Sequence, residues 1–262
     1  MAERSGRVGK VLVTGAGGAV GRPACAELAR RGHSVHGLDR QAEPPADWAG
    51  DAWHVGDVAD GDVVRRAMAG MEAVVHLAAT PDDAPFLEQL LEPNVVGLFN
   101  VMDAARQAGV KRVVLASSMQ VVSGLRAKLD KHEGPLRTSD GAAPTNHYAL
   151  TKVWAEQMGE MYARTYEMSV IAARIGWLPR NPADAARLAR RGAEEAYLSW
   201  NDAGRFFADA VEAEGVTYAV LFAVSAGNGK QWYDRETPRQ VIGYEARDRF
   251  PAGLPFEVGG EE

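Results

Sequence analysis

A glycine-rich turn that joins an apolar run to a helix-forming segment constrains this chain more than any other feature. The run Lys10–Thr14 is short, apolar and rich in β-branched residues, as expected of a buried strand. The next segment, Gly15–Gly21, contains four glycines, and a helix is predicted from there to about Arg31, with Gly32 as its C-terminal cap. A strand, a tight turn and a helix in this order predict the first unit of a parallel α/β sheet.

The same alternation continues along most of the chain. Strands are predicted at 34–38, 52–55, 73–77, 112–116, 169–173 and 218–223, and helices at 60–69, 86–107, 145–166, 202–214 and 238–242. Residues 124–144 contain five glycines and prolines and are expected to form a loop, and residues 180–195 are expected to be partly helical. Strands that alternate with helices imply right-handed βαβ units, so the fold class is predicted as α/β, a Rossmann-type doubly wound parallel sheet.

Composition and charge exclude several other classes of protein. The chain has 262 residues, one cysteine (Cys25) and a net charge of −6, so an intrachain disulfide, a cysteine-rich zinc site and a nucleic-acid partner are not expected. The segment Met1 to Lys10 is polar, unlike a signal peptide. No apolar stretch approaches the ~18 to 20 residues that cross a bilayer, so a cytoplasmic protein without a membrane partner or a metal is expected.

The glycine-rich turn has the spacing of a dinucleotide cradle. Gly15 permits the tight turn, Gly18 lets the backbone approach a pyrophosphate, and Gly21 allows the helix to pack closely on the strand. The backbone amides of the helix N-terminus, at Ala19 and Val20, then face the phosphates. A glycine-rich turn without a ligand is the alternative interpretation, but its position between the first strand and the first helix favours the cradle.

Acidic residues follow the second and third predicted strands. Asp39 lies 18 residues after Gly21, where a carboxylate accepts hydrogen bonds from the adenosine ribose and repels a 2′-phosphate, which favours NAD over NADP. Arg40 is expected to stack on the adenine or to tolerate a phosphate. Asp57 is expected to meet the adenine amino group, although an acid at a helix N-terminus is a second interpretation.

A tyrosine and a lysine share one face of the helix predicted at 145–166. Tyr148 and Lys152 are four residues apart, and an ammonium near the phenol lowers a tyrosine pKa that is otherwise about 10. Tyr148 is therefore predicted to be a general base and Lys152 its partner. Ser118, supported by Ser117, ends a strand at the carboxyl edge of the sheet and is predicted to hydrogen-bond the reacting oxygen. Asn94 is expected either to fix a helix kink or to hold a water near the site.

Together these motifs resemble the extended short-chain dehydrogenase/reductase superfamily, also described as the NAD-dependent epimerase/dehydratase family. The segments TGAGGAVG, HLAA, NVVG, SS at 117–118 and YALTK carry this resemblance. A closer resemblance is to the uronate dehydrogenases, which oxidise a sugar acid with NAD, and it is carried by RIG at 174–176, SWND at 199–202 and QWYD at 231–234. It implies that residues 1–175 form an NAD-binding domain and that residues 176–262 form a small substrate-binding region packed on it.

The resemblance also implies which residues touch the ligands. The catalytic residues are Ser118, Tyr148 and Lys152. The expected NAD contacts are Gly15, Gly18, Ala19, Val20, Gly21, Asp39, Arg40, Asp57, Val58, Leu77, Ala78, Ala79, Asn94, Tyr148, Lys152 and Ile175. The expected substrate contacts are Thr80, Ser118, Met119, Gln120, Trp177 and Arg187.

Three positions depart from the uronate dehydrogenase pattern. Met119 and Gln120 replace the Asn-His pair of that family, and Trp177 replaces a small serine. The segment that supplies the family's carboxylate-binding arginine is longer here; Arg187 is the first choice, and Arg180, Arg190 and Arg191 are alternatives. The cofactor chemistry therefore carries over more directly than the uronate substrate.

Three functions are compatible with these residues. The first is an NAD-dependent dehydrogenase of a sugar, a sugar acid or a related polyol. The second is a sugar epimerase without net redox, although nucleotide-sugar epimerases usually have a larger C-terminal region. The third is a non-catalytic NAD sensor, which would need no Ser118, Tyr148 and Lys152. The resemblance also implies a homodimer through two long helices.

Overall fold

The computed structural model describes residues 9–130 and 134–258, and the polar segment at residues 1–8 lies outside them. The described residues form one seven-stranded parallel sheet in the order β3-β2-β1-β4-β5-β6-β7. This order reverses direction between β1 and β4, as in a doubly wound sheet, and confirms the predicted fold class. The strands are β1 (Lys10–Thr14), β2 (Ser34–Asp39), β3 (Ala52–Val55), β4 (Ala73–His76), β5 (Arg112–Ser118), β6 (Ser169–Ile175) and β7 (Tyr218–Ala223).

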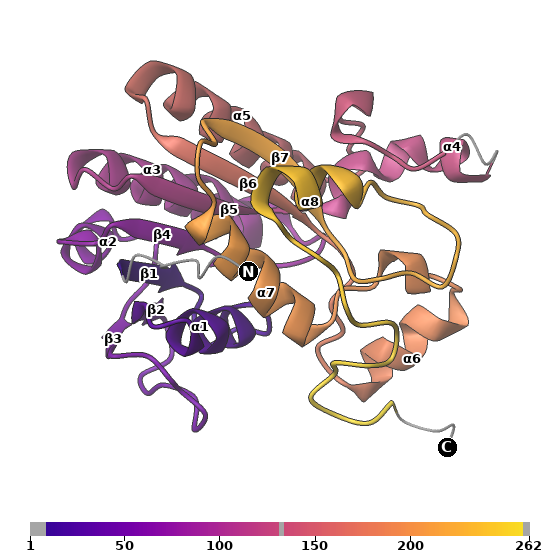
Figure 1. Cartoon of the computed structure of the whole chain (residues 1–262). Helices are drawn as coiled ribbons and strands as arrows, with labels where there is room; N and C mark the ends of the chain where they lie inside the picture. Colours follow the sequence, from indigo (N-terminus) through magenta and orange to yellow (C-terminus); the bar gives the residue numbers. More distant parts are fainter. Residues whose placement is uncertain (1–8, 131–133, 259–262) are drawn as a thin grey trace.

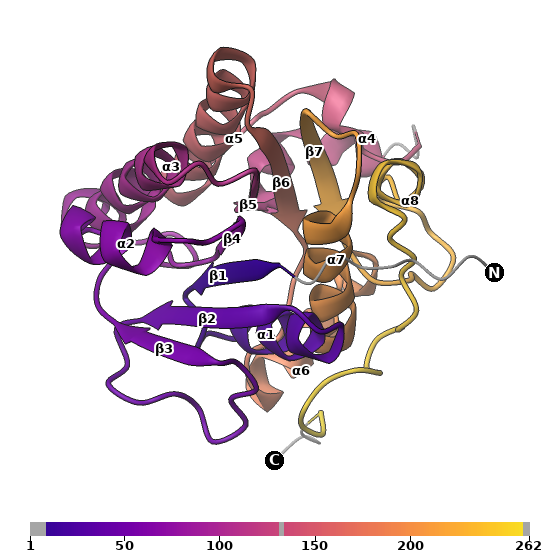
Figure 2. The same ribbon diagram turned by 60° about the vertical axis from the view of Figure 1, so that its left-hand side comes forward.

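Helices cover both faces of the sheet (Figures 1 and 2). One face carries α2 (Gly61–Met68), α3 (Gly97–Gln107) and α5 (His147–Tyr166), and the other carries α1 (Gly21–Arg30), α7 (Trp200–Glu212) and α8 (Glu236–Ile242). Shorter elements are α4 (Arg126–Asp130), α6 (Pro182–Arg190), the 3-10 helices η2 (Met119–Leu125), η3 (Thr138–Asp140) and η4 (Glu194–Ala196), and the π-helical η1 (Phe86–Val96).

Alternation along the strands divides the core into two layers. Val11 and Val13 of β1 face α1 and α7, whereas Leu12 between them faces the α2–α3–α5 layer. The same alternation holds on β6, where Ile171 and Val170 belong to opposite layers. Because both faces of the sheet are buried at its centre, β1, β4 and β5 contain continuous apolar runs, which is why the sequence predicted these strands well.

The structure corrects three predicted elements. The single helix expected at 86–107 is divided, because Pro93 inside η1 has no N–H to donate and the hydrogen-bond pattern widens before α3 begins. The loop expected at 124–144 contains α4 and η3, with η2 leading into α4. Strand β5, expected at 112–116, extends through Ser117 and Ser118, which end it as expected.

The C-terminal part of the chain is built into the sheet. Strand β7 pairs with β6 from Val170↔Tyr218 to Ile175↔Ala223, and α7 packs along α1. Residues of 176–262 therefore share the core of the first 175 residues.

A fully buried carboxylate fastens the last described segment to α7. The Asp202 oxygens accept hydrogen bonds from the Ser225 hydroxyl at 2.7 Å, from the backbone N–H groups of Arg247 and Asp248 at 3.0 Å each, and from the Arg205 guanidinium. Each of these contacts supplies a donor that a buried carboxylate requires.

Candidate active site

The glycine-rich turn is packed tightly on one side and open on the other. Gly15 has a positive φ of 68°, and a Cβ there would lie 2.8 Å from the Ala78 nitrogen. A Cβ on Gly21 would lie 2.1 Å from the Gly15 carbonyl oxygen. A Cβ on Gly18 would approach only that oxygen, at 3.2 Å, so Gly18 faces open space. Gly15 and Gly21 thus hold the turn against the sheet, and Gly18 leaves room for a ligand.

Helix α1 begins at this turn without a side-chain cap, since its N-cap residue is Val20. Helices α2, α5, α6 and α7 have side-chain caps, from Asp60, Asn146, Asn181 and Ser199 respectively, whereas α3 and α8, like α1, have none. The first amides of a helix have no acceptor within it, and an anion is their alternative partner. The uncapped start of α1 therefore fits a phosphate group.

The predicted acidic residues lie at the same edge of the sheet. One Asp39 oxygen accepts a hydrogen bond from the Gly17 N–H at 2.9 Å, so the carboxylate touches the glycine-rich turn. Arg40 lies 3.8 Å from the Asp57 carboxylate, and its side chain is 77% exposed. The structure thus brings Asp39, Arg40 and Asp57 to one end of the cradle, as an adenosine site requires.

The side-chain amide of Asn94 is hydrogen-bonded within the protein through both its oxygen and its NH₂ group. Its amide oxygen accepts a hydrogen bond from the Thr80 N–H at 2.8 Å, and its NH₂ group donates to the Thr80 carbonyl at 3.1 Å and to the Thr151 hydroxyl at 3.2 Å. These bonds tie η1, the segment after β4 and α5 together. Of the two predicted roles for Asn94, a helix kink or a bound water, this geometry favours fixing the irregular helix, and the same three bonds leave little of the side chain for the expected NAD contact.

The three predicted catalytic residues come together at the carboxyl edge of the sheet. Ser118 ends β5 and pairs in register with Ile175 at the end of β6. Tyr148 lies in the first turn of α5, which the Asn146 side chain caps by accepting from the Ala149 N–H at 2.7 Å. The Ser118 side chain lies close enough to the Tyr148 hydroxyl to affect the Tyr148 pKa. The Lys152 ammonium lies 5.5 Å from the centre of the Tyr148 ring, one helical turn away.

The expected lowering of the tyrosine pKa is absent from the protein without cofactor. Burial raises the pKa of Tyr148 to about 12, and the nearby Ser118 side chain opposes this rise. Burial lowers the pKa of Lys152 to about 8. Desolvation penalises both charged forms, and Lys152 lies over the ring rather than beside the hydroxyl, which is why it does not dominate.

A buried ion pair supports the catalytic residues from behind. Glu156 follows Lys152 by four residues on α5, and its carboxylate accepts from the Arg174 guanidinium at 2.8 and 2.9 Å and from the Ser117 hydroxyl at 2.6 Å. The Glu156 and Arg174 side chains are 5% and 3% exposed. This contact locks α5 against β5 and β6. No motif in the sequence indicated this pair, because Glu156 on α5 and Arg174 on β6 meet only in the folded chain.

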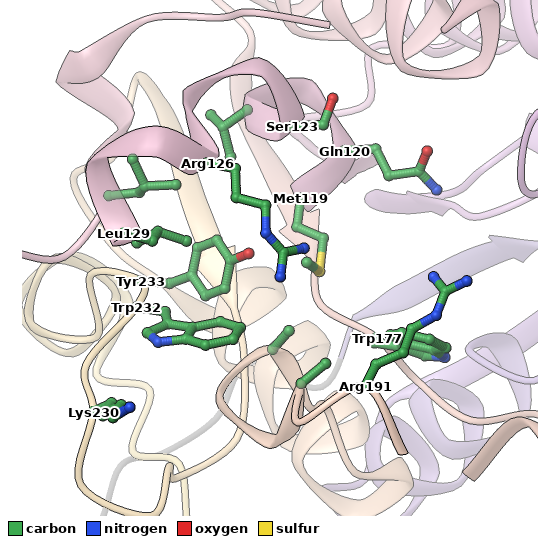
Figure 3. A pocket seen from close by; sticks show the side chains of 14 residues that line it. Met119, Gln120, Ser123, Arg126, Leu129, Trp177, Arg191, Lys230, Trp232 and Tyr233 are labelled. Carbon is green, nitrogen blue, oxygen red and sulfur yellow. The ribbon is translucent and has the colours of Figure 1, made fainter. Parts of the chain in front are cut away.

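A cavity of about 590 Å³ opens directly beyond the catalytic edge (Figure 3). It begins at Met119 and Gln120, which follow Ser118, and its opposite wall includes Trp177, two residues after Ile175. Its other walls come from η2 and α4, from the segment after α6 and from the segment after β7. They include Val122, Ser123, Arg126, Leu129, Leu136, Arg191, Ala193, Ala196, Lys230, Trp232 and Tyr233.

Gln120 also links this cavity to the catalytic helix. Its side-chain oxygen accepts a hydrogen bond from the Asn146 amide at 2.9 Å, and Asn146 is the cap of α5. Ser118 in turn caps η2 by accepting from the Gln120 N–H at 3.1 Å. A substitution of Gln120 would therefore alter the cavity wall and, through Asn146, the position of Tyr148.

The structure places Arg187 differently from the prediction. Its guanidinium pairs with Asp184 at 2.6 Å and stacks on Trp177 at 5.0 Å from the ring centre, and it does not line the cavity. Arg191 stacks on the same ring at 5.9 Å and does line it. Arg126 and Lys230 line it as well, and no motif had indicated them, because folding brings them together from distant parts of the chain.

Within residues 9–130 and 134–258, no group of three potential metal ligands occurs, and no helix is long and apolar enough to cross a membrane. The open face at Gly18, the uncapped α1 and the position of Asp39 all fit a dinucleotide.

Comparisons with known proteins agree with this geometry. Residues 11–178 match the model of the "NAD dependent epimerase/dehydratase family". An NAD-dependent glucose-6-phosphate dehydrogenase of Haloferax volcanii is 31% identical over 94% of this chain and 96% of its own. A uronate dehydrogenase of Pseudomonas syringae pv. tomato is 30% identical over 86% of this chain and 77% of its own.

A solved structure of similar length is also close. The structure of MoeE5 in complex with UDP-glucose and NAD superposes with a TM-score of 0.78 and 26% identity, covering 95% of this chain and 97% of that one. Chain length alone therefore does not exclude a nucleotide sugar, in contrast to the expectation from the short C-terminal region.

Proposed function

The chain belongs to the NAD dependent epimerase/dehydratase family, and from this premise we propose that it is an NAD-dependent dehydrogenase that oxidises a sugar or a sugar acid. The observation that carries the proposal is the position of Ser118, Tyr148 and Lys152 between the glycine-rich cradle and the cavity beyond β5. The relatives named as glucose-6-phosphate and uronate dehydrogenases support oxidation of a sugar.

The residues of the cradle hold NAD in this proposal. Gly15, Gly18, Ala19, Val20 and Gly21 surround the pyrophosphate, Asp39 binds the ribose, and Arg40, Asp57 and Val58 surround the adenine. The backbone of Leu77, Ala78 and Ala79 and the end of β6 at Ile175 line the nicotinamide side. When bound, NAD accepts a hydride from the carbon that is oxidised.

Side chains of the protein bind the substrate hydroxyl and accept its proton. Ser118 holds the substrate hydroxyl by a hydrogen bond, and Tyr148 receives its proton. Tyr148 starts as a neutral phenol because burial raises its pKa to about 12, so it acts as a base only when nearby positive charge stabilises the phenolate. Lys152 supplies one such charge and also holds the nicotinamide ribose. Thr80, Met119, Gln120 and Trp177 surround the substrate.

We infer that the two parts of the chain have the binding roles that the resemblance implies. Residues 1–175 bind the cofactor, and residues 176–262 supply much of the substrate cavity while sharing the sheet. Trp177, Arg191 and Tyr233 are among the cavity residues from this second region.

The decisive experiment follows NADH absorbance with purified protein, NAD and a panel of galacturonate, glucuronate, glucose 6-phosphate, glucose and arabinose. We expect reduction of NAD with at least one sugar. Tyr148→Phe should lower kcat by about 10²- to 10⁴-fold, the usual contribution of a positioned acid or base, with little change in NAD affinity. Equal loss of turnover and of NAD binding would make Tyr148 structural. Isomerisation of a sugar without net reduction would favour an epimerase.

We also propose that the protein forms a homodimer through α3 and α5. Large apolar side chains are exposed on this pair of helices and the adjoining η1: Leu87 (68%), Phe99 (50%), Leu150 (53%) and Trp154 (45%). A second copy would bury them. Light scattering after size-exclusion chromatography should give twice the chain mass. Trp154→Glu should give a monomer, whereas Val55→Glu, at an exposed site on β3, should not.

A further inference from the structure

The cavity beyond β5 carries concentrated positive charge in a protein whose net charge is −6. Arg126, Arg191 and Lys230 line it, and each comes from a different segment: the start of α4, the residue after α6, and the segment after β7. None of its described lining residues is an aspartate or a glutamate. The charge of these three side chains is thus not balanced from within the cavity wall.

Most arginines of the described chain form an ion pair with an acidic side chain, whereas these three cations do not. Arg180 and Arg187 at the same end of the sheet pair with Asp82 and Asp184, each at 2.6 Å. Arg235, on the segment that carries Lys230, pairs with Glu195 at 3.0 Å. No such pair joins Arg126, Arg191 or Lys230 to an acid of the described residues. They are therefore available to an anion from outside the protein.

The wall that carries Lys230 is held in place. Tyr233 bridges to Leu136, with the Leu136 N–H donating to the Trp232 carbonyl at 2.8 Å and the Asp234 N–H donating to the Leu136 carbonyl at 2.9 Å. The Asn228 N–H donates to Glu195 at 2.7 Å. The cavity is thus shaped before a ligand binds, which lowers the entropic cost of binding.

The three cations project from different walls of the cavity. Figure 3 shows the Arg126 guanidinium pointing into the cavity near Met119 and Tyr233, with Arg191 on the opposite side. The 3-10 segment η2, which separates Arg126 from Ser118 along the chain, is kinked at Val122.

We propose that Arg126, Arg191 and Lys230 form a binding site for the phosphate of a sugar phosphate, one hydroxyl of which is oxidised beside Ser118. This inference rests on the proposed dehydrogenase function and names its substrate class. A phosphate monoester carries a charge of about −1.5 to −2 at pH 7 and has three acceptor oxygens, so it suits several cations better than a single carboxylate does. Its phosphorus also lies two bonds beyond the sugar carbon, whereas a uronate carboxylate contains that carbon itself.

The test compares glucose 6-phosphate, glucose, glucuronate and UDP-glucose in steady-state kinetics on wild-type protein and on Arg126→Ala, Arg191→Ala and Lys230→Ala. Each variant should raise KM for glucose 6-phosphate about tenfold or more, the loss of one charge-assisted hydrogen bond, without raising KM for glucose. Arg126→Lys should restore part of the affinity. Arg65→Ala on α2, which removes an arginine distant from the cavity, should leave the kinetics unchanged.

A binding measurement keeps the inference testable apart from turnover. Trp177 and Trp232 line the cavity, so glucose 6-phosphate should change tryptophan fluorescence, and Arg126→Ala should weaken that change. Phosphate-selective binding that the cavity variants abolish, in a protein that reduces no NAD with any sugar, would refute the proposed function and support the phosphate site. Oxidation of glucose or glucuronate with no preference for the phosphate, and no effect of the three variants, would overturn the phosphate site alone. Tighter binding of UDP-glucose than of glucose 6-phosphate would assign these cations to a nucleotide sugar and overturn the monophosphate.

Discussion

The buried Glu156–Arg174 pair gives a sharp test of how the catalytic helix is held. Glu156→Gln removes the negative charge and leaves the Arg174 guanidinium buried at 3% exposure without its counter-ion. Removing one partner of a buried ion pair typically costs about 3 to 5 kcal/mol, because the remaining charge is not solvated. For a domain of this size that loss lowers Tm by about 6 to 20 °C.

The double variant Glu156→Met/Arg174→Met should be more stable than Glu156→Gln. It replaces both charges by apolar side chains, which is often neutral or stabilising, and leaves only the Ser117 hydroxyl without its acceptor, at a cost of about 1 to 3 kcal/mol. A matched control is Glu236→Gln, which breaks the exposed Glu236–Arg239 pair, with side chains 52% and 54% exposed, and should leave stability nearly unchanged.

Urea denaturation and calorimetry measure these differences, and turnover reports the functional effect. Glu156→Gln should lower kcat because α5, which carries Tyr148 and Lys152, loses its contact with β5 and β6. A Glu156→Gln protein within about 1 kcal/mol of wild type would refute the reasoning, as would a double variant whose loss equals the sum of the two single losses.

Three further predictions concern the cofactor cradle and the lysine. Asp39→Ala should relax the preference for NAD over NADP, measured as the ratio of kcat/KM; an unchanged ratio would remove Asp39 from the ribose site. Gly18→Ala should lower NAD affinity in titration calorimetry with little change in Tm. Gly21→Ala, whose Cβ would lie 2.1 Å from a carbonyl oxygen, should lower Tm sharply. Equal effects of the two variants on affinity and on Tm would contradict the distinction between the open Gly18 and the packed Gly21. Lys152→Met should stabilise the cofactor-free protein by about 3 kcal/mol below pH 8, because burial lowers the pKa of Lys152 from 10.5 to about 8. Since the folded protein loses that proton before the unfolded chain does, the difference should vanish as pH rises from 8 to 10.5, and a constant difference would contradict the burial argument.

The fold was predictable because its determinants are local. The β-branched runs of β1 and β5 are buried on both faces, so their sequences are apolar without interruption. Gly15 and the start of α1 lie next to one another in the chain, and Tyr148 and Lys152 are four residues apart on one helix. Each of these features could be inferred from spacing alone.

The remaining features depend on contacts between distant residues. The change from η1 to α3 could have been inferred from Pro93, but its supporting contacts from Asn94 to Thr80 and Thr151 required the folded structure. The choice of Arg187 came from its spacing after β6. Spacing does not show that Asp184 and Trp177 engage this side chain while Arg126 and Lys230 reach the cavity from other segments.

The Asp202 contacts bear on how the protein is synthesised. Two of the N–H groups that satisfy this fully buried carboxylate belong to Arg247 and Asp248, near the end of the chain, whereas α7 packs on α1 near its beginning. A nascent chain still attached to the ribosome, with residues 247 and 248 inside the exit tunnel, cannot bury Asp202 with all of its donors. Asp202 therefore acquires all of its donors only after residues 247 and 248 have left the exit tunnel, so the final docking of α7 follows the synthesis of this later segment.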